Sequence, residues 1–354
     1  MQQLRAPLGG RRAVVRALVV AIAVAPAACG SSGNAPPPGS EAGVVARDGG
    51  DARRDASGDA TAESGDAGAE SDANGDATSD RDANGDAAEV STEVCGGFVM
   101  PNPSSAGLPN PAVYIVNGDG TITEKVSGLT WQATVDTMRY SYEDAATYCA
   151  AKGAGWRLPT RLELVSLVDY TVGAPGPTIN AVFTSTPPDE FWTSTLYYGN
   201  DGDAWAVGFD VGYSDYGVRN NPDLVRCVLA PAVTCLPARY QLEAGGLVRD
   251  LTTGLTWQQT IDGVQYTWAD ATAHCAALGG GWRLPSIAEL QTIVDDKKEY
   301  PAADLDVFPD TPHDDFWSAS PDASGAGAAW YVDFFYGATD LDVPTRVFYV
   351  RCVL

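Results

Sequence analysis

Two pairs of adjacent carboxylates are the first residues in this chain of 354 that could do chemistry. Asp189–Glu190 and Asp314–Asp315 each stand directly before Phe-Trp, and paired acids can act as the acid and base of a glycoside hydrolase. Adjacent residues on a strand point to opposite faces, so one acid of each pair would face away from a shared site. We therefore expect turn or capping roles for them. The two histidines, His274 and His313, lie in no nucleophile motif, and we expect no catalytic residue and no enzyme.

A calcium loop is the second chemistry that the sequence suggests. The segment Asn117–Ile122 reads NGDGTI, which is similar to the middle of such a loop. With Gly120 sixth, the first and twelfth ligand positions fall on Ile115 and Val126, whose side chains carry no oxygen. The cysteines show no zinc-type spacing either. We expect no metal ligand and no cofactor, with calcium kept as the lesser alternative.

Aromatic and polar residues in three later stretches are the strongest candidates for binding a ligand. The stretches Tyr197–Trp205, Gly212–Asn221 and Tyr331–Asp340 combine Tyr, Asn and Asp, and sugars suit stacking rings with polar side chains beside them. The alternative is that these rings pack the core. The candidate ligand-binding residues are Tyr213, Asp215, Tyr216, Asn220, Tyr336 and Asp340.

The chain contains one domain twice, and this repeat sets the elements that position those residues. Ser127–Tyr170 aligns with Thr253–Asp296 at an offset of 126, and GWRLPT recurs as GWRLPS. The offset becomes 125 in the later part, where both copies close with VRCVL. A tandem duplication of a domain of about 105–120 residues follows. The candidate loops differ between the copies while the frame does not, which fits variable binding on a fixed scaffold.

Each copy is predicted to be α+β, with two helices and a small, mostly antiparallel sheet. The first helix is expected over Ser141–Gly153 and over the matching Thr267–Gly279. The second begins at Thr160 and at Ser286, each followed three residues later by Glu, the pattern of a capping box. Arg157 of GWRLPT is expected to hold a carboxylate or backbone carbonyls. The remaining alternating aromatic segments predict strands.

The cysteines after Cys29 are even in number, which predicts disulfides in an exported chain. They are Cys95, Cys149, Cys227, Cys235, Cys275 and Cys352. The repeat pairs Cys149 with Cys227 and Cys275 with Cys352, so that each bridge joins the first helix to the last strand of its own copy. The remaining two are expected to pair with each other.

The N-terminus predicts export. A basic region precedes the short apolar stretch Ala17–Ala28, which is too short for a membrane span. Cys29 follows two alanines, so residues 1–29 are expected to be a signal peptide with a lipobox-like Cys29 that becomes lipid-anchored; ordinary cleavage nearby is the alternative. Residues 30–93 are rich in Asp, Ala and Gly and predict a disordered acidic linker. The two domains are then placed at 94–232 and 233–354.

The charge excludes several partners. The net charge is −24, and each segment after the basic N-terminus is acidic. Nucleic acid, anionic lipid and polysulfated sugars are therefore disfavoured. We expect contact with a membrane only through the lipid anchor, and a location in the bacterial cell envelope or on the cell surface.

The set of motifs resembles a known family. GDGTITEKVSGLTWQ (Gly118–Gln132), GWRLPT with the helix that follows it, FWTST and the closing VRCVL resemble the Lcl C-terminal domain family, over residues 110–229 and 240–354. The namesake is the C-terminal domain of a collagen-like bacterial adhesin, and most members have no assigned function. The pattern is also similar to C-type-lectin-like and formylglycine-generating-enzyme-like folds, which implies two tandem C-type-lectin-like domains. The EPN, QPD and WND triplets of calcium-dependent lectins are absent from the sequence.

These observations favour a non-enzymatic adhesion or binding lipoprotein of the cell surface, which recognises an extracellular carbohydrate or protein ligand through its late loops. Two alternatives stay open. One is an enzyme of formylglycine-generating-like ancestry, which converging carboxylates or a free thiol would favour. The other is a purely structural envelope protein, which a surface without a pocket would favour.

Overall fold

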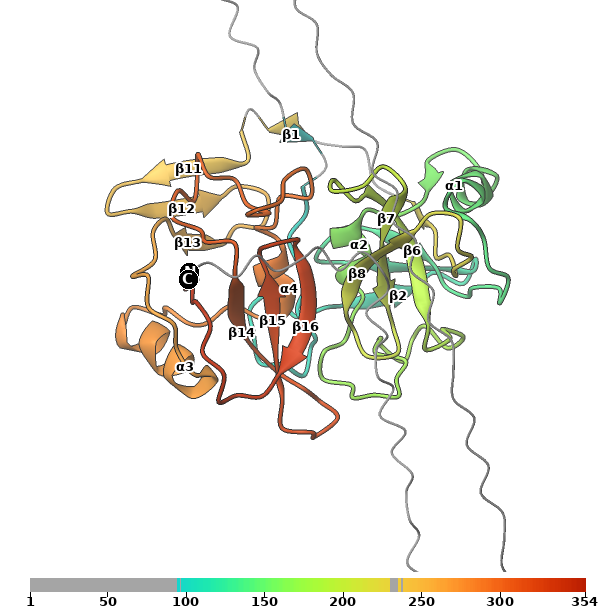
Figure 1. Ribbon diagram of the computed structural model, residues 1–354. Helices are drawn as coiled ribbons and strands as arrows, with labels where there is room; N and C mark the ends of the chain where they lie inside the picture. The colour runs from blue at the N-terminus through green and yellow to red at the C-terminus, as the bar shows by residue number, and fades with distance from the viewer. Residues whose placement is uncertain (1–93, 96, 230–234, 237) are drawn as a thin grey trace, which may run out of the picture. The chain divides into compact units, whose positions relative to one another are not determined.

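The computed structural model describes residues 94–95, 97–229, 235–236 and 238–354 (Figure 1). The expected signal peptide, Cys29 and the acidic linker lie outside the described residues. Within the described ranges, no helix is long and apolar enough to cross a membrane. The described residues of both copies belong to a single compact unit.

The first copy consists of a five-stranded sheet, a three-stranded sheet and two helices. Its elements are β2 (Tyr114–Val116), β3 (Thr121–Glu124), β4 (Thr130–Gln132), α1 (Tyr142–Ala150), β5 (Trp156–Arg157), α2 (Arg161–Val165), β6 (Glu190–Leu196), β7 (Asp203–Gly208), β8 (Ser214–Val218) and β9 (Val228–Leu229). The strand orders are β2-β3-β4-β9-β5 and β6-β7-β8, and the pairs are antiparallel.

The second copy repeats this plan with two three-stranded antiparallel sheets. Its elements are β11 (Tyr240–Glu243), β12 (Leu247–Asp250), β13 (Thr256–Gln258), α3 (Trp268–Ala277), α4 (Ile287–Gln291), β14 (Asp315–Pro321), β15 (Ala329–Asp333) and β16 (Ala338–Asp342). The closing segment of the second copy forms isolated β-bridges from Val353 to Trp257 and to Arg283. The matching segment of the first copy forms the two-residue strand β9. The predicted α+β class with two helices per copy is confirmed.

The GWRLP motif builds the start of each second helix. Thr160 accepts a hydrogen bond from the Glu163 N–H, and the Glu163 carboxylate accepts one from the Thr160 N–H, which makes the predicted capping box. The same box forms around Ser286. Arg157 donates a hydrogen bond to each carboxylate oxygen of Glu163, at 2.7 and 2.6 Å. The motif therefore has a structural role, because the buried Glu163 carboxylate accepts hydrogen bonds both from an arginine and from the N-terminus of the helix.

Two of the three expected disulfides are confirmed. Cys149 is bonded to Cys227 and Cys275 to Cys352, with sequence separations of 78 and 77. Strand β1 (Val94–Cys95) pairs antiparallel with β10 (Cys235–Leu236), and its backbone register sets Cys95 opposite Cys235. The side chains of those two cysteines lie outside the described residues, so this third bridge stays a prediction.

The two copies share one core. A single cluster of buried apolar side chains includes residues of both, among them Trp131 and Trp257, which are fully buried at matching positions. Smaller clusters around each disulfide belong to one copy alone. The buried Arg226 and Arg351 of the two VRCVL segments bond the carbonyl oxygens at the end of β4 and β13. The core is thus continuous from one copy to the other.

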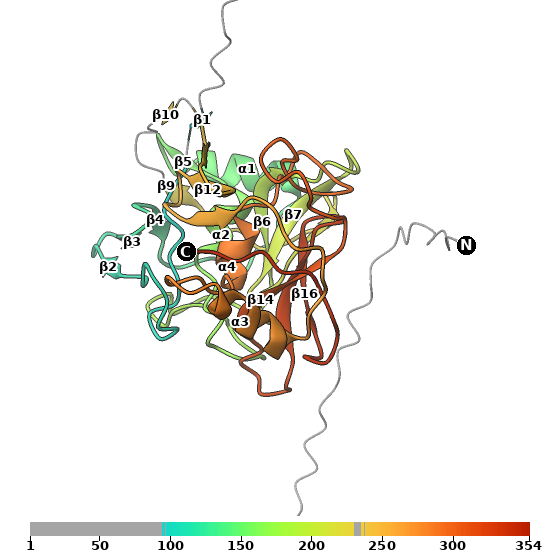
Figure 2. The same ribbon diagram turned by 90° about the vertical axis from the view of Figure 1, so that its left-hand side faces the viewer.

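The copies meet through matching elements. Strand β8 lies beside β16 (Figure 1), and the Ser214 N–H donates to Thr339 Oγ1 at 2.8 Å. Helices α2 and α4 also lie side by side in both views (Figure 2). Between them, the buried Arg161 donates to Gln291 Oε1 at 3.2 Å and to Asp296 Oδ1 at 2.7 Å. A buried polar network therefore holds the junction.

Candidate ligand-binding site

Aromatic rings of both copies gather where β8 meets the turn between β15 and β16. We call this group the junction aromatic surface; it consists of Tyr197, Tyr216, Tyr300, Phe335 and Tyr336. Tyr197 stacks on Tyr216, with centroids 3.7 Å apart and planes 5° apart. Tyr216 lies 6.2 Å from Tyr336, which lies 5.8 Å from Tyr300 and 4.4 Å from Phe335. Four separate segments thus contribute to one run of rings.

The buried junction supports this surface from below. Trp205 on β7 is paired in register with Tyr216 on β8, and its ring lies edge-on to Tyr216 at 5.8 Å and to Tyr197 at 6.0 Å. The guanidinium of Arg161 lies 4.9 Å from the centre of the same indole. Trp205 is only 1% exposed. The rings above it are therefore held by packed side chains and by strand pairing.

The hydroxyl groups of this surface are hydrogen-bond donors at neutral pH. Burial raises the pKa of Tyr197 and of Tyr216 above the ordinary phenol value. Loss of water contact, followed by the negative charge of Glu299, raises the pKa of Tyr300 to about 12. Tyr197 donates to Glu299 Oε2 at 3.1 Å. The surface therefore combines ring faces, neutral hydroxyls and a carboxylate.

Two of the six predicted binding residues, Tyr216 and Tyr336, come together at the junction, whereas Asp215 and Asp340 point to the opposite faces of their strands. Tyr216 and Tyr336 belong to the junction aromatic surface, and both are half-buried. Asp215 on β8 and Asp340 on β16 are exposed. They occupy matching positions, each one residue after the pair that joins the two strands. The predicted loops are thus adjacent in space, although 125 residues separate the matching strands.

The other two predicted residues lie elsewhere. The Tyr213 hydroxyl donates to Glu190 Oε1 at 2.5 Å within the first copy, and Asn220 is exposed in the turn after β8. Two contributors were missed by the sequence reasoning, Tyr300 and Glu299. The sequence signal that could have identified Tyr300 is a tyrosine before a proline, in a loop whose sequence differs between the two copies. Tyr300 is 49% exposed, so it presents the largest free ring area of the tyrosines in the run.

The paired carboxylates occupy structural positions. Asp189 forms an ion pair with Arg139, and Glu190 accepts the hydroxyl of Tyr213. In the second copy, Asp314 Oδ1 accepts the N–H of its neighbour at 2.9 Å. These contacts bind the acids to neighbouring groups of their own copy.

The histidines and the NGDGTI segment are also engaged in local packing. His274 lies 4.6 Å from the ring of Tyr266, and His313 lies 5.8 Å from Phe335. Asp119 accepts the N–H of Thr121 at 3.0 Å and so closes the turn between β2 and β3. Among the described residues, no group of three or more His, Cys, Asp or Glu side chains could hold a metal ion.

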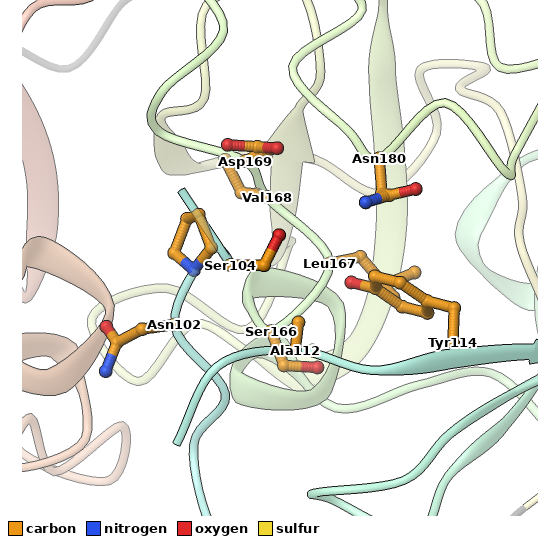
Figure 3. A pocket seen from close by; sticks show the side chains of 10 residues that line it. Asn102, Ser104, Ala112, Tyr114, Ser166, Leu167, Val168, Asp169 and Asn180 are labelled. Carbon is orange, nitrogen blue, oxygen red and sulfur yellow. The ribbon is translucent and has the colours of Figure 1, made fainter. Parts of the chain in front are cut away.

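Two cavities lie away from the junction aromatic surface. One, lined by Tyr114, Asp169 and Asn180 among others, has a volume of about 10 Å³ (Figure 3), which is room for a single water molecule. The other has a volume of about 420 Å³ and lies between residues 102–108 of the first copy and the start of α4. Only the second is large enough for an organic ligand.

Comparison with known families agrees with the repeat. The profile of the Lcl C-terminal domain matches the chain twice, over residues 120–229 and 246–354. Each match contains one GWRLP motif and one of the two bonded cysteine pairs. No curated protein matches the chain in sequence.

Proposed function

This chain belongs to the Lcl C-terminal domain family in two copies, and from that premise we propose that it is a non-enzymatic binding protein of the bacterial cell envelope. Cys29 would carry a lipid anchor, and the acidic residues 30–93 would hold the paired domains away from the membrane. The family has no assigned activity, so the ligand must be argued from the surface of this chain.

One observation carries the proposal: Tyr216, Tyr300, Phe335 and Tyr336, rings of both copies, gather at the junction and are partly exposed, and the buried Tyr197 stacks on Tyr216. A folded core does not require half-exposed rings to be gathered, and such clusters mark interaction sites. The ring faces suit the C–H faces of pyranose sugars, and the neutral hydroxyls with Glu299 suit sugar hydroxyl groups.

The charge of the chain narrows the class of sugar. The net charge is −24, and the Glu299 carboxylate accepts the hydroxyl of Tyr197 at the rings. A sulfated or uronic-acid-rich glycan would be repelled. We therefore propose a neutral or amino-substituted glycan as the ligand.

A protein partner is the second candidate. Leu196 and Tyr198 flank Tyr197 and are 49% and 62% exposed. Tyrosines and exposed apolar side chains next to one another are typical of protein interfaces. Since Tyr197 between them is buried, these two side chains face the other way and form an apolar area of their own, which is the observation that favours a protein over a sugar.

A glycan array probed with the full chain, with and without calcium, tests the proposal. Tyr216→Ala and Tyr336→Ala should each weaken binding about tenfold, since one stacking ring contributes about 1–1.5 kcal/mol. Tyr148→Ala is the matched control, because it removes the α1 ring from a different pair, Tyr140–Tyr148. An array without signal in both conditions would contradict the glycan and favour the protein partner. Mass spectrometry of recovered glycans checks the non-enzymatic part: a cleaved or modified product would overturn it.

A further inference from the structure

The cavity of about 420 Å³ is lined by residues of both copies and lies at the start of α4 in the second copy. Its floor is the start of α4 with Ala288, and one wall is the end of β14 with Ala319 and Pro321. The first copy closes it with Pro103 and Leu108. Its volume lies in the range of small-molecule sites, about 300–1,000 Å³. It shares no lining residue with the junction aromatic surface.

The loop that covers the cavity is firmly fixed. The buried Asn102 donates to Glu289 Oε1 at 3.1 Å and accepts from Ser286 Oγ at 2.8 Å. These are the residues of the α4 capping box. The backbone of Asn102 also bonds Asn110 and Ala112, which closes the loop on itself. The cavity is therefore preformed, as ligand sites usually are.

The repeat shows how the lining of this cavity differs from the matching positions of the first copy. At the positions matching Ala288 and Ala323, the first copy carries Leu162 and Tyr198. Pro321 likewise replaces Leu196. Tyr198 and Leu196 are exposed on the first copy. The second copy has thus lost volume from the side chains that line the space.

The lining selects an uncharged ligand. In a chain of net charge −24, no residue that lines this cavity is charged. An anion would find no basic partner, and a cation would find no carboxylate. The polar lining groups are hydroxyls and one amide, and several already bond within the protein: Ser286 with Asn102, and Thr171 with Asp169. Most of the binding free energy would therefore come from apolar contact.

We propose that this cavity is a second binding site, independent of the glycan site, for an uncharged and mainly apolar small molecule. The ligand lies between the fixed loop 102–108 and the alanines of the second copy. Substituting those alanines with the residues of the first copy fills the site without disturbing the repeat fold.

The test uses prodan, a neutral and apolar fluorophore, titrated against the full chain. We expect saturable binding with emission shifted to shorter wavelength. The double substitution Ala288→Leu with Ala323→Tyr should weaken binding at least tenfold, because both positions line the space and both side chains become larger. Tyr198→Ala, at the position of the first copy that matches Ala323, should leave binding unchanged. Tyr336→Ala should also leave it unchanged, which separates this cavity from the junction aromatic surface.

Folding does not confound the result. Ala323 is exposed, so Ala323→Tyr alone can replace the double substitution if the change at Ala288 lowers the urea midpoint. Failure of the full chain to bind prodan would overturn the proposal. Equal binding by the full chain and by the filled variants would also overturn it, because the dye would then lie elsewhere.

Discussion

Replacing Arg161 alone should cost the protein more stability than replacing it together with its partner. The Arg161 side chain is fully buried, and its Nε donates to Asp296 Oδ1 at 2.7 Å. The positions that match Arg161 and Asp296 in the other copy are Ile287 and Tyr170. Ile287 and Tyr170 are both buried in the shared core, so the protein has an ion pair at one of the two matching places and uncharged residues at the other.

The structure sets the size of the effect. Arg161→Ile leaves the Asp296 carboxylate without its cation, and removing one member of a buried pair costs about 3–5 kcal/mol. Since 22% of the Asp296 side chain is exposed, water offsets part of this, and we expect a loss near the lower end, about 3 kcal/mol. Adding Asp296→Tyr removes the stranded charge and copies the uncharged residues of the matching place. The double variant should lie within about 1 kcal/mol of the native chain, since an apolar replacement of a buried pair is often neutral.

The assay is urea unfolding at pH 7 and pH 5 with the disulfides intact. Burial already raises the pKa of Asp296, and loss of Arg161 raises that pKa further. An acid whose pKa is higher in the folded state stabilises the fold at low pH, and this stability is lost as the pH rises through the folded-state pKa. The Arg161→Ile deficit should therefore be smaller at pH 5. A single variant that loses less than about 1 kcal/mol, or a double variant as unstable as the single one, would refute the reasoning.

Two further predictions concern the frame and the ring surface. Replacing Cys149 and Cys227 with alanine should lower the free energy of unfolding by about 4.5 kcal/mol, because the entropy of the opened loop stabilises the unfolded chain. The Cys275–Cys352 pair closes a span of nearly equal length, so its removal should cost about the same. Calorimetry that gave very different values for the two bridges would contradict a purely entropic effect. An ultraviolet titration should show phenols ionising near pH 12, and Tyr300→Phe should lower the absorbance change there by that of one phenol, with Tyr266 accounting for another. Because the pKa of Tyr300 is raised on folding, this group's contribution to stability should fall between about pH 10 and pH 12. A Tyr300 that ionises at the value of an exposed phenol would show that neither loss of water contact nor Glu299 acts on it.

Features of the fold that depend on short segments could be predicted from the sequence. The capping boxes at Thr160 and Ser286 need residues only three apart, and the repeat reduced the cysteine pairings to one choice per copy. The shared core could not be predicted. Gln291 bonds Arg161 across 130 positions, and neither residue type recurs at the matching place in the other copy. A contact made by residues that do not repeat leaves no periodic signal in the sequence.

The candidate site was predicted in part for a related reason. Composition identified Tyr216 and Tyr336, because rings and acids are concentrated in those stretches. It could not exclude Tyr213, whose hydroxyl turns back to an acid of its own copy. It also missed Tyr300, a single ring among lysines and acids. Composition states which residues a loop carries, whereas packing decides which of them face the same surface.

The differences between the two copies indicate where binding resides. Residues that repeat, such as Arg157 and Arg283, perform the same structural task in both copies, so their retention concerns the frame. The junction is where matching residues differ, and an exchange such as Leu162 for Ala288 changes the space without breaking a hydrogen bond. If the junction is the binding region, making the copies alike there, at positions outside the Arg161–Asp296 pair, should remove binding while the urea midpoint is retained. Equalising positions in the frame should do neither. Two variants would separate selection for ligand binding from neutral drift between duplicated domains. One would carry the other copy's residue at a junction position, and the second would carry the other copy's residue at a frame position.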